Sequence, residues 1–66
     1  MIACNAVKVM TVLEITTNRP TGNEGVIVFK SGKRMHFFLR EGMANVPIGT
    51  RSVRSVKIGN FACKIG

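Results

Sequence analysis

Apolar and polar residues alternate along much of the chain, and glycines interrupt this alternation every few residues. Residues 7–16, for example, place Val7, Val9, Leu13 and Ile15 on one face of an extended segment, which is typical of a half-buried strand. The chain is rich in Val, Ile, Thr and Phe, which are favoured in strands, and gives little evidence of helix. The pattern therefore predicts short strands joined by turns.

Residues 25–30 and 33–40 are predicted to form a β-hairpin around a two-residue turn, Ser31-Gly32. In this register the core face carries Val26, Val28, Met35, Phe37 and Leu39, and the opposite face carries Ile27, Phe29, Arg34, His36, Phe38 and Arg40. A shift of the register by one residue would mix the core-facing residues of one strand with the outward-facing residues of the other, so both predicted faces depend on the length of the turn.

Two stretches are predicted to be connections. Residues 18–23 contain several turn-forming residues and are expected to form a loop. Residues 43–50 contain Pro47 and Gly49, and they are expected to form a connecting loop or a single helical turn.

The C-terminal part predicts a second hairpin, with strands at residues 51–58 and 61–65 and a turn at Gly59-Asn60. The residues expected to face inward are Val56, Ile58, Phe61, Cys63 and Ile65. The alternation breaks within residues 53–56, which indicates a bulge or a strand that starts late.

These segments predict an all-β fold with little helix and one domain over residues 1–66. We expect a small five-stranded antiparallel meander or barrel-like sheet, of the SH3-like or OB-like size class. A domain of this size has a marginal core. We therefore expect its sheet edges to be closed in a barrel or covered by a second subunit, and we predict a homodimer.

The two cysteines, Cys4 and Cys63, lie near opposite ends of the sequence. They could meet if the terminal segments pair, but two cysteines do not make the disulfide framework of a small secreted domain. We interpret both as small buried apolar residues in a reducing compartment. A single histidine and no CxxC motif give no zinc site, so neither metal nor cofactor is expected.

The charge of the chain is strongly basic, at +7 with a sequence pI of about 10.5. This balance favours an anionic partner. Residues 1–15 show neither the basic region nor the apolar run that a signal peptide needs, so none is expected, and no apolar run of the sequence is long enough to span a membrane. We therefore expect a cytoplasmic protein with no membrane partner.

Basic and aromatic residues gather in residues 30–40, and this concentration suggests nucleic-acid binding. Cations can follow the phosphate backbone while aromatic rings stack on bases. Single-stranded nucleic acid or RNA is favoured over duplex reading, because no recognition helix is evident. The candidate contact residues are Lys30, Lys33, Arg34, His36, Phe38, Arg40, Arg51, Arg54, Lys57 and Lys64. The sequence leaves open whether Lys57 and Lys64 continue the same charged face.

Two other functions fit the same composition. The chain could be a small regulatory or inhibitory protein whose cations bind an acidic surface of a larger protein. It could also be a homo-oligomeric structural subunit. Catalysis is not expected, because the sequence has one histidine, three acidic residues and no tyrosine, which leaves too few groups for a nucleophilic or two-metal site.

Overall fold

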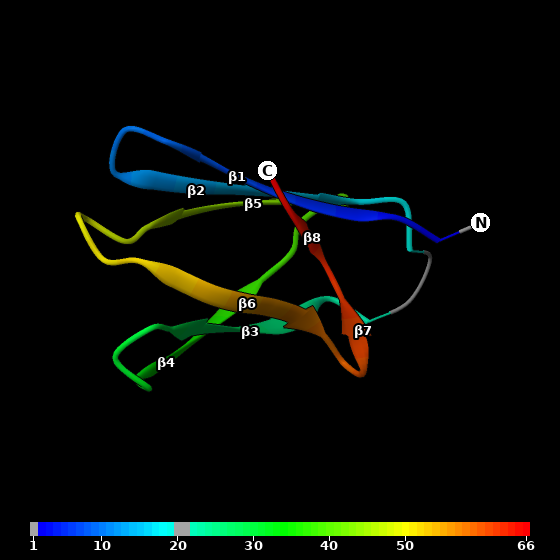
Figure 1. Ribbon diagram of the computed structural model, residues 1–66. Helices are drawn as coiled ribbons and strands as arrows, with labels where there is room; N and C mark the ends of the chain where they lie inside the picture. The colour runs from blue at the N-terminus through cyan, green and yellow to red at the C-terminus, as the bar shows by residue number, and fades with distance from the viewer. Residues whose placement is uncertain (1, 20–21) are drawn as a thin grey trace.

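The computed structural model describes residues 2–19 and 22–66, which contain eight strands and no helix. The strands are β1 (Cys4–Val9), β2 (Val12–Thr17), β3 (Glu24–Phe29), β4 (Arg34–Phe38), β5 (Met43–Pro47), β6 (Val53–Ile58), β7 (Phe61–Ala62) and β8 (Lys64–Ile65). They form two four-stranded sheets, with strand orders β5-β2-β1-β8 and β4-β3-β6-β7. The sheets lie one above the other, and β7 and β8 lead from the second sheet to the first (Figure 1). The all-β prediction is confirmed, whereas the predicted five-stranded antiparallel meander or barrel-like sheet is not observed, because the strands form two sheets and β1 pairs with β8 in parallel.

The first sheet contains a hairpin that the sequence pattern did not reveal. The predicted single strand at residues 7–16 is divided by a turn at Met10-Thr11, where Met10 has a φ of 57°. Because the chain reverses there, Ala6 pairs with Ile15. Ala6, Leu13 and Ile15 are buried, while Val7 and Val9 point away from the core and are exposed. The prediction that all four large apolar residues of this segment share one face is therefore wrong.

The third strand of the first sheet is β5, in the stretch predicted to be a loop or helical turn. It pairs with β2 from Thr16–Met43 to Val12–Pro47 and buries Ala44 and Val46. Pro47 is compatible with this strand because β5 lies at the edge of the sheet, where its missing N–H need not pair. The prediction of a connecting loop or helical turn over residues 43–50 is therefore wrong for Met43–Pro47, which form β5.

The core lies between the two sheets. Its largest fully buried side chains are Phe29, Leu13, Ile15, Ile27, Ile48, Ile58 and Val56. The predicted inward residues of the second hairpin are buried in part: Val56, Ile58 and Cys63 are buried, Phe61 is half-buried and Ile65 is exposed. No helix of the described residues has the length and apolar character needed to cross a membrane.

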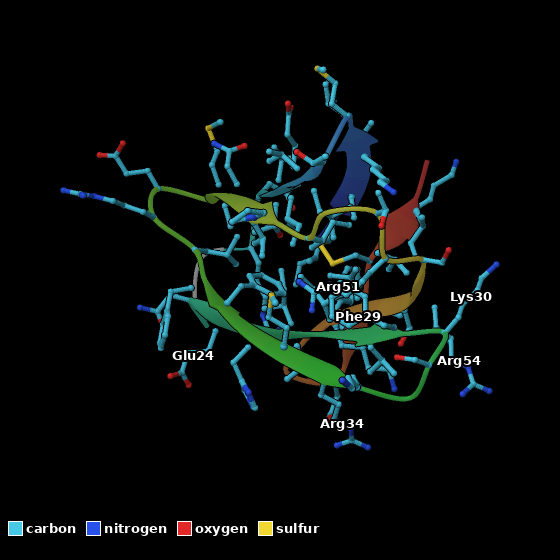
Figure 2. The ribbon with its side chains drawn as sticks, turned by 90° about the vertical axis from the view of Figure 1, so that its left-hand side faces the viewer. Glu24, Phe29, Lys30, Arg34, Arg51 and Arg54 are labelled. Atoms are coloured by element: carbon cyan, nitrogen blue, oxygen red, sulfur yellow. A yellow bond between two sulfur atoms is a disulfide. The ribbon has the colours of Figure 1, made fainter. Side chains whose placement is uncertain are left out.

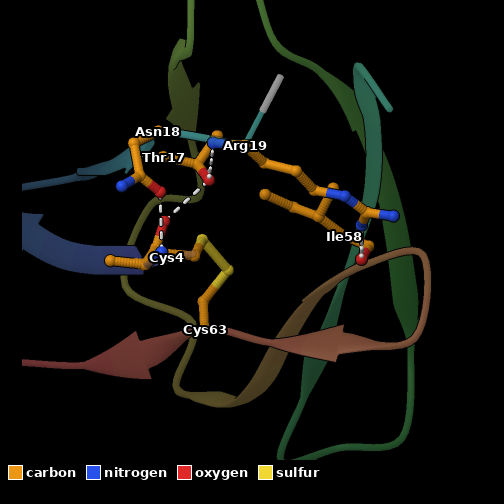
Figure 3. Close-up of a disulfide and its surroundings, with 7 residues drawn as sticks. Cys4, Thr17, Asn18, Arg19, Ile58 and Cys63 are labelled. Atoms are coloured by element: carbon orange, nitrogen blue, oxygen red, sulfur yellow. Dashed lines mark hydrogen bonds between the residues drawn. A yellow bond between two sulfur atoms is a disulfide. The ribbon is translucent and has the colours of Figure 1, made fainter. Parts of the chain in front are cut away.

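Cys4 and Cys63 form a disulfide bond (Figure 3). Both are buried, as predicted, but the expectation that they are unpaired is wrong. The parallel pairing of β8 with β1, through Asn5–Lys64, brings their neighbours together with a Cα–Cα distance of 4.6 Å. The predicted reducing compartment depended on unpaired cysteines and therefore loses its support.

Residues 17–19, at the end of β2, form hydrogen bonds near the disulfide both to the segment before β1 and to β6 (Figure 3). The backbone N–H of Ala3 donates to Oδ1 of Asn18, and the hydroxyl of Thr17 donates to the carbonyl oxygen of Ala3, both at 2.7 Å. Nη1 of Arg19 donates to the carbonyl oxygen of Ile58 at 2.6 Å. Arg19 is thus a structural cation that joins the end of β2 to the end of β6.

Candidate nucleic-acid interface

The hairpin of β3 and β4 has a three-residue turn, one residue longer than predicted. The backbone N–H of Phe29 donates to the carbonyl oxygen of Lys33 at 2.9 Å, and that of Gly32 donates to the carbonyl oxygen of Phe29 at 2.8 Å. Gly32 has a φ of 92°, as expected for the last residue of a three-residue hairpin loop. The extra residue shifts the register, so that Val28 lies opposite Arg34 rather than Met35.

This shift exchanges the faces of β3 but not those of β4. Ile27 and Phe29, predicted on the exposed side, are buried, while Val26 and Val28 face outward and are half-buried. In β4 the predicted faces are correct. Phe37 and Leu39 are buried, Met35 is half-buried, and Arg34, His36 and Phe38 are exposed. The prediction that Val26 and Val28 face the core is therefore wrong.

The outward-facing residues of β4, β3 and β6 form adjacent cross-strand rows. Val26 lies between His36 and Lys57, and Val28 lies between Arg34 and Ser55. Glu24 lies opposite Phe38 at the other end of β3. The structure thus brings Arg34, His36, Phe38 and Lys57 to one exposed sheet face.

A groove of about 430 Å³ runs over this face, which we call the β3 groove. It is lined by Glu24, Gly25, Val26, Val28, Arg34, His36, Ser55, Lys57 and Gly59. Its floor is β3, with apolar Val26 and Val28, and its sides are β4 and β6. Glu24 and Arg34 both project from the side of this sheet that faces away from the first sheet (Figure 2). A volume of this size lies in the range that accommodates a small ligand or one unit of a polymer.

A second group of cations lies at the turn end of the same sheet. Lys30 lies in the hairpin turn and Lys33 directly follows it, and both are exposed. The backbone N–H of Lys30 donates to the carbonyl oxygen of Ser52 at 2.9 Å, which fixes the turn beside the start of β6. There the register shifts, with Val28 paired to Ser55 but Phe29 paired to Val53, so Arg54 is the extra residue of a bulge. The register shift confirms the predicted bulge within residues 53–56, and Figure 2 shows Arg54 near Lys30 at this end.

Arg51, another predicted contact residue, packs against the core. Its guanidinium carbon lies 4.4 Å from the centre of the Phe29 ring, and its Nε donates to the carbonyl oxygen of Ile48 at 2.9 Å. It does not line the β3 groove. The Arg51 side chain therefore packs over the Phe29 ring at the edge of the core.

The two remaining predicted cations are separated from the groove. Arg40 lies in the tight connection to β5, where its backbone N–H donates to the carbonyl oxygen of Met43 at 2.8 Å. Lys64 lies in β8 of the first sheet, whereas Lys57 lies in β6 of the second. Lys57 therefore continues the charged face of the first hairpin, opposite Val26, whereas Lys64 does not.

The sequence pattern missed Glu24 and the apolar floor of the groove. Glu24 precedes the predicted first strand of the hairpin by one residue, so it does not belong to either predicted strand face. The position of Gly32 is the signal that indicates the floor. Three-residue hairpin loops carry glycine at their last position, and a loop at residues 30–32 turns Val26 and Val28 outward.

Comparison of the chain with models of protein families, with curated proteins and with solved structures gave no match. The function must therefore be inferred from the residues themselves. Among the described residues, no three His, Cys, Asp or Glu side chains gather where they could hold a metal ion.

Proposed function

We propose that the protein binds single-stranded nucleic acid, with the backbone and bases lying over the β3 groove. The observation that carries this proposal is the exposed sheet face on which Arg34 and Lys57 border an apolar floor beside Phe38. The cations provide phosphate contacts, and an exposed aromatic ring provides a stacking surface. Phe38 is 68% exposed, although phenylalanine is among the residue types most often buried.

The charges at the turn end extend this face. Lys30, Lys33 and Arg54 are exposed next to the groove, so a strand lying along β3 can make further phosphate contacts there. A sheet face suits a single strand because unpaired bases can lie flat on aromatic and apolar side chains.

The proposal is tested by titrating fluorescently labelled oligonucleotides at several salt concentrations. The double variant Arg34→Gln, Lys57→Gln is expected to bind more weakly. The slope of log affinity against log salt is expected to fall by about 1.4, because each phosphate contact with a single strand contributes about 0.7. The control is Lys8→Gln, Lys64→Gln, which removes the same charge from the first sheet. This control is expected to keep most of the slope.

Three outcomes would contradict the proposal. The wild-type protein could fail to bind oligonucleotides at low salt. The two double variants could lose affinity equally, which would indicate a response to net charge alone. An acidic polypeptide could bind more tightly than any oligonucleotide and compete for Arg34 and Lys57, which would favour an acidic protein partner.

We also propose that the protein is a homodimer through the outer face of the first sheet. On this face Val9, Val12 and Pro47 form one cross-strand row, and Glu14 is its one charged residue in β1, β2 and β5. The basic face belongs to the other sheet. Two copies joined through the first sheets would therefore keep their basic faces apart, which limits repulsion between chains of charge +7.

A further inference from the structure

Glu24 is an acidic residue within an otherwise basic groove. The chain has only three acidic residues, and Glu24 is the one that lines the β3 groove. Its side chain is exposed and makes no ion pair with any described residue. A carboxylate at this position repels phosphate groups, so it weakens backbone binding unless it contacts another part of the ligand.

The position of Glu24 separates it from the main phosphate contact of β4. Arg34 lies opposite Val28, four residues along β3 from Glu24. This separation corresponds to about 13 Å along the strand, which exceeds the screening length of about 8 Å at physiological salt. A phosphate held by Arg34 is therefore little affected by the carboxylate.

The neighbour of Glu24 across the strand pair is Phe38. Side chains directly opposite in an antiparallel pair have Cβ atoms about 5 Å apart. A base that stacks on the Phe38 ring consequently brings its hydrogen-bonding edge beside the Glu24 carboxylate. Unpaired bases are commonly read in this way, through their Watson–Crick edges.

The chemistry of a carboxylate selects one base. An ionised carboxylate only accepts hydrogen bonds, through two oxygens. Guanine presents two adjacent donors on its Watson–Crick edge, N1–H and the 2-amino group, which match these oxygens. Adenine, cytosine and uracil each place an acceptor beside their single donor group, and that acceptor repels the second oxygen.

We propose that Glu24 selects guanine at the end of the β3 groove next to Phe38. This inference depends on the proposed binding of single-stranded nucleic acid and names the base that the site prefers. The groove then has two parts: a phosphate-binding part around Arg34 and Lys57, and a base-selecting part made by Phe38 and Glu24.

The test compares the wild-type protein with Glu24→Gln on three labelled probes. These are an oligouridine, the same strand with one central guanosine, and the same strand with one central inosine, which lacks only the 2-amino group. The wild-type protein is expected to bind the guanosine strand at least about tenfold more tightly than the inosine strand, as one hydrogen bond to a charged acceptor would give. In Glu24→Gln this ratio is expected to fall to about twofold or less, while binding of oligouridine is unchanged or tighter.

The control Glu41→Gln makes the same charge change in the turn between β4 and β5, outside the β3 groove, and it should keep the guanosine preference. If Glu24→Gln binds all three probes more tightly by one common factor and the wild-type protein shows no preference, Glu24 is only a repulsive charge. That result would overturn base selection and leave the proposed function in place. If the wild-type protein binds none of the probes, both proposals fail.

Discussion

Gly25 and Phe37 lie opposite each other in β3 and β4, and the Phe37 ring occupies the space where a side chain of Gly25 would lie. A Cβ atom at residue 25 would contact this ring and would lie 2.6 Å from the carbonyl oxygen of Lys57. The inward face of β3 therefore requires glycine at residue 25, because a core ring and the backbone of β6 fill the space there.

Gly25→Ala is expected to lower the free energy of unfolding by about 1–3 kcal/mol, because the added methyl group overpacks a filled site. Denaturation in urea measures the change. Gly49→Asn is the control, since nothing lies within 4 Å of a Cβ at residue 49 and asparagine tolerates its φ of 65°. Its cost is expected to stay within about 0.5 kcal/mol. Equal costs for the two variants would show that the Phe37 ring can move aside.

Arg51→Ala is expected to lower the free energy of unfolding by about 1–2 kcal/mol. The variant loses the contact of the guanidinium with the Phe29 ring, worth about 0.5–1 kcal/mol, and the hydrogen bond to Ile48, worth about 0.5–1.5 kcal/mol. Arg54→Ala removes the same charge from an exposed bulge residue and should change stability by less than about 0.5 kcal/mol. Thermal or urea denaturation of both variants separates a role of Arg51 in the fold from an effect of net charge.

The disulfide is expected to supply a large part of the stability of this small domain. Cys4 and Cys63 are 59 residues apart, and closing a loop of this length in the unfolded chain stabilises the native state by about 4 kcal/mol on the chain-entropy model. The variant Cys4→Ala, Cys63→Ala should therefore unfold at a much lower urea concentration than the oxidised protein. Reductant should destabilise the wild-type protein and leave the double variant unchanged. Equal stability of the oxidised and reduced proteins would contradict this prediction.

The faces of β4 could be predicted from the sequence, because polar Arg34 and His36 alternate with apolar Met35 and Phe37. Residues 26–29 of β3 are all apolar, so no alternation indicates which of them face the core. The face of β3 then depends on the length of the turn, and a two-residue turn in place of the observed three-residue turn gives the wrong answer. For this reason the sequence predicts the outward residues of β4, Arg34 and His36, but not the groove floor of Val26 and Val28 in β3.

The arrangement of the two sheets depends on contacts distant in sequence. The turn at Met10 lacks glycine, proline or asparagine, so nothing marks the hairpin of β1 and β2. The chain leaves the second sheet at Cys63 and joins β1 in the first, and no local pattern distinguishes this step from a continuing hairpin. The disulfide and the separation of Lys57 from Lys64 both follow from that step.

The proposed homodimer predicts that a charge on the outer face of the first sheet dissociates the protein. Val9 is 45% exposed, and it lies in the same cross-strand row as Val12 and Pro47. Val9→Lys should therefore fold normally but bury an unpaired charge in the interface, which is strongly unfavourable.

Sedimentation equilibrium is expected to show wild-type protein at twice the 7.2 kDa mass of the chain and Val9→Lys at that mass itself. The control Thr50→Lys adds the same charge at an exposed residue outside the strands and should remain dimeric. A wild-type protein that sediments at 7.2 kDa at working concentration would rule out the dimer. Because the apolar row and the β3 groove belong to different sheets, monomeric Val9→Lys should keep the affinity of each groove for a short oligonucleotide and lose only the added affinity of paired grooves for a long one.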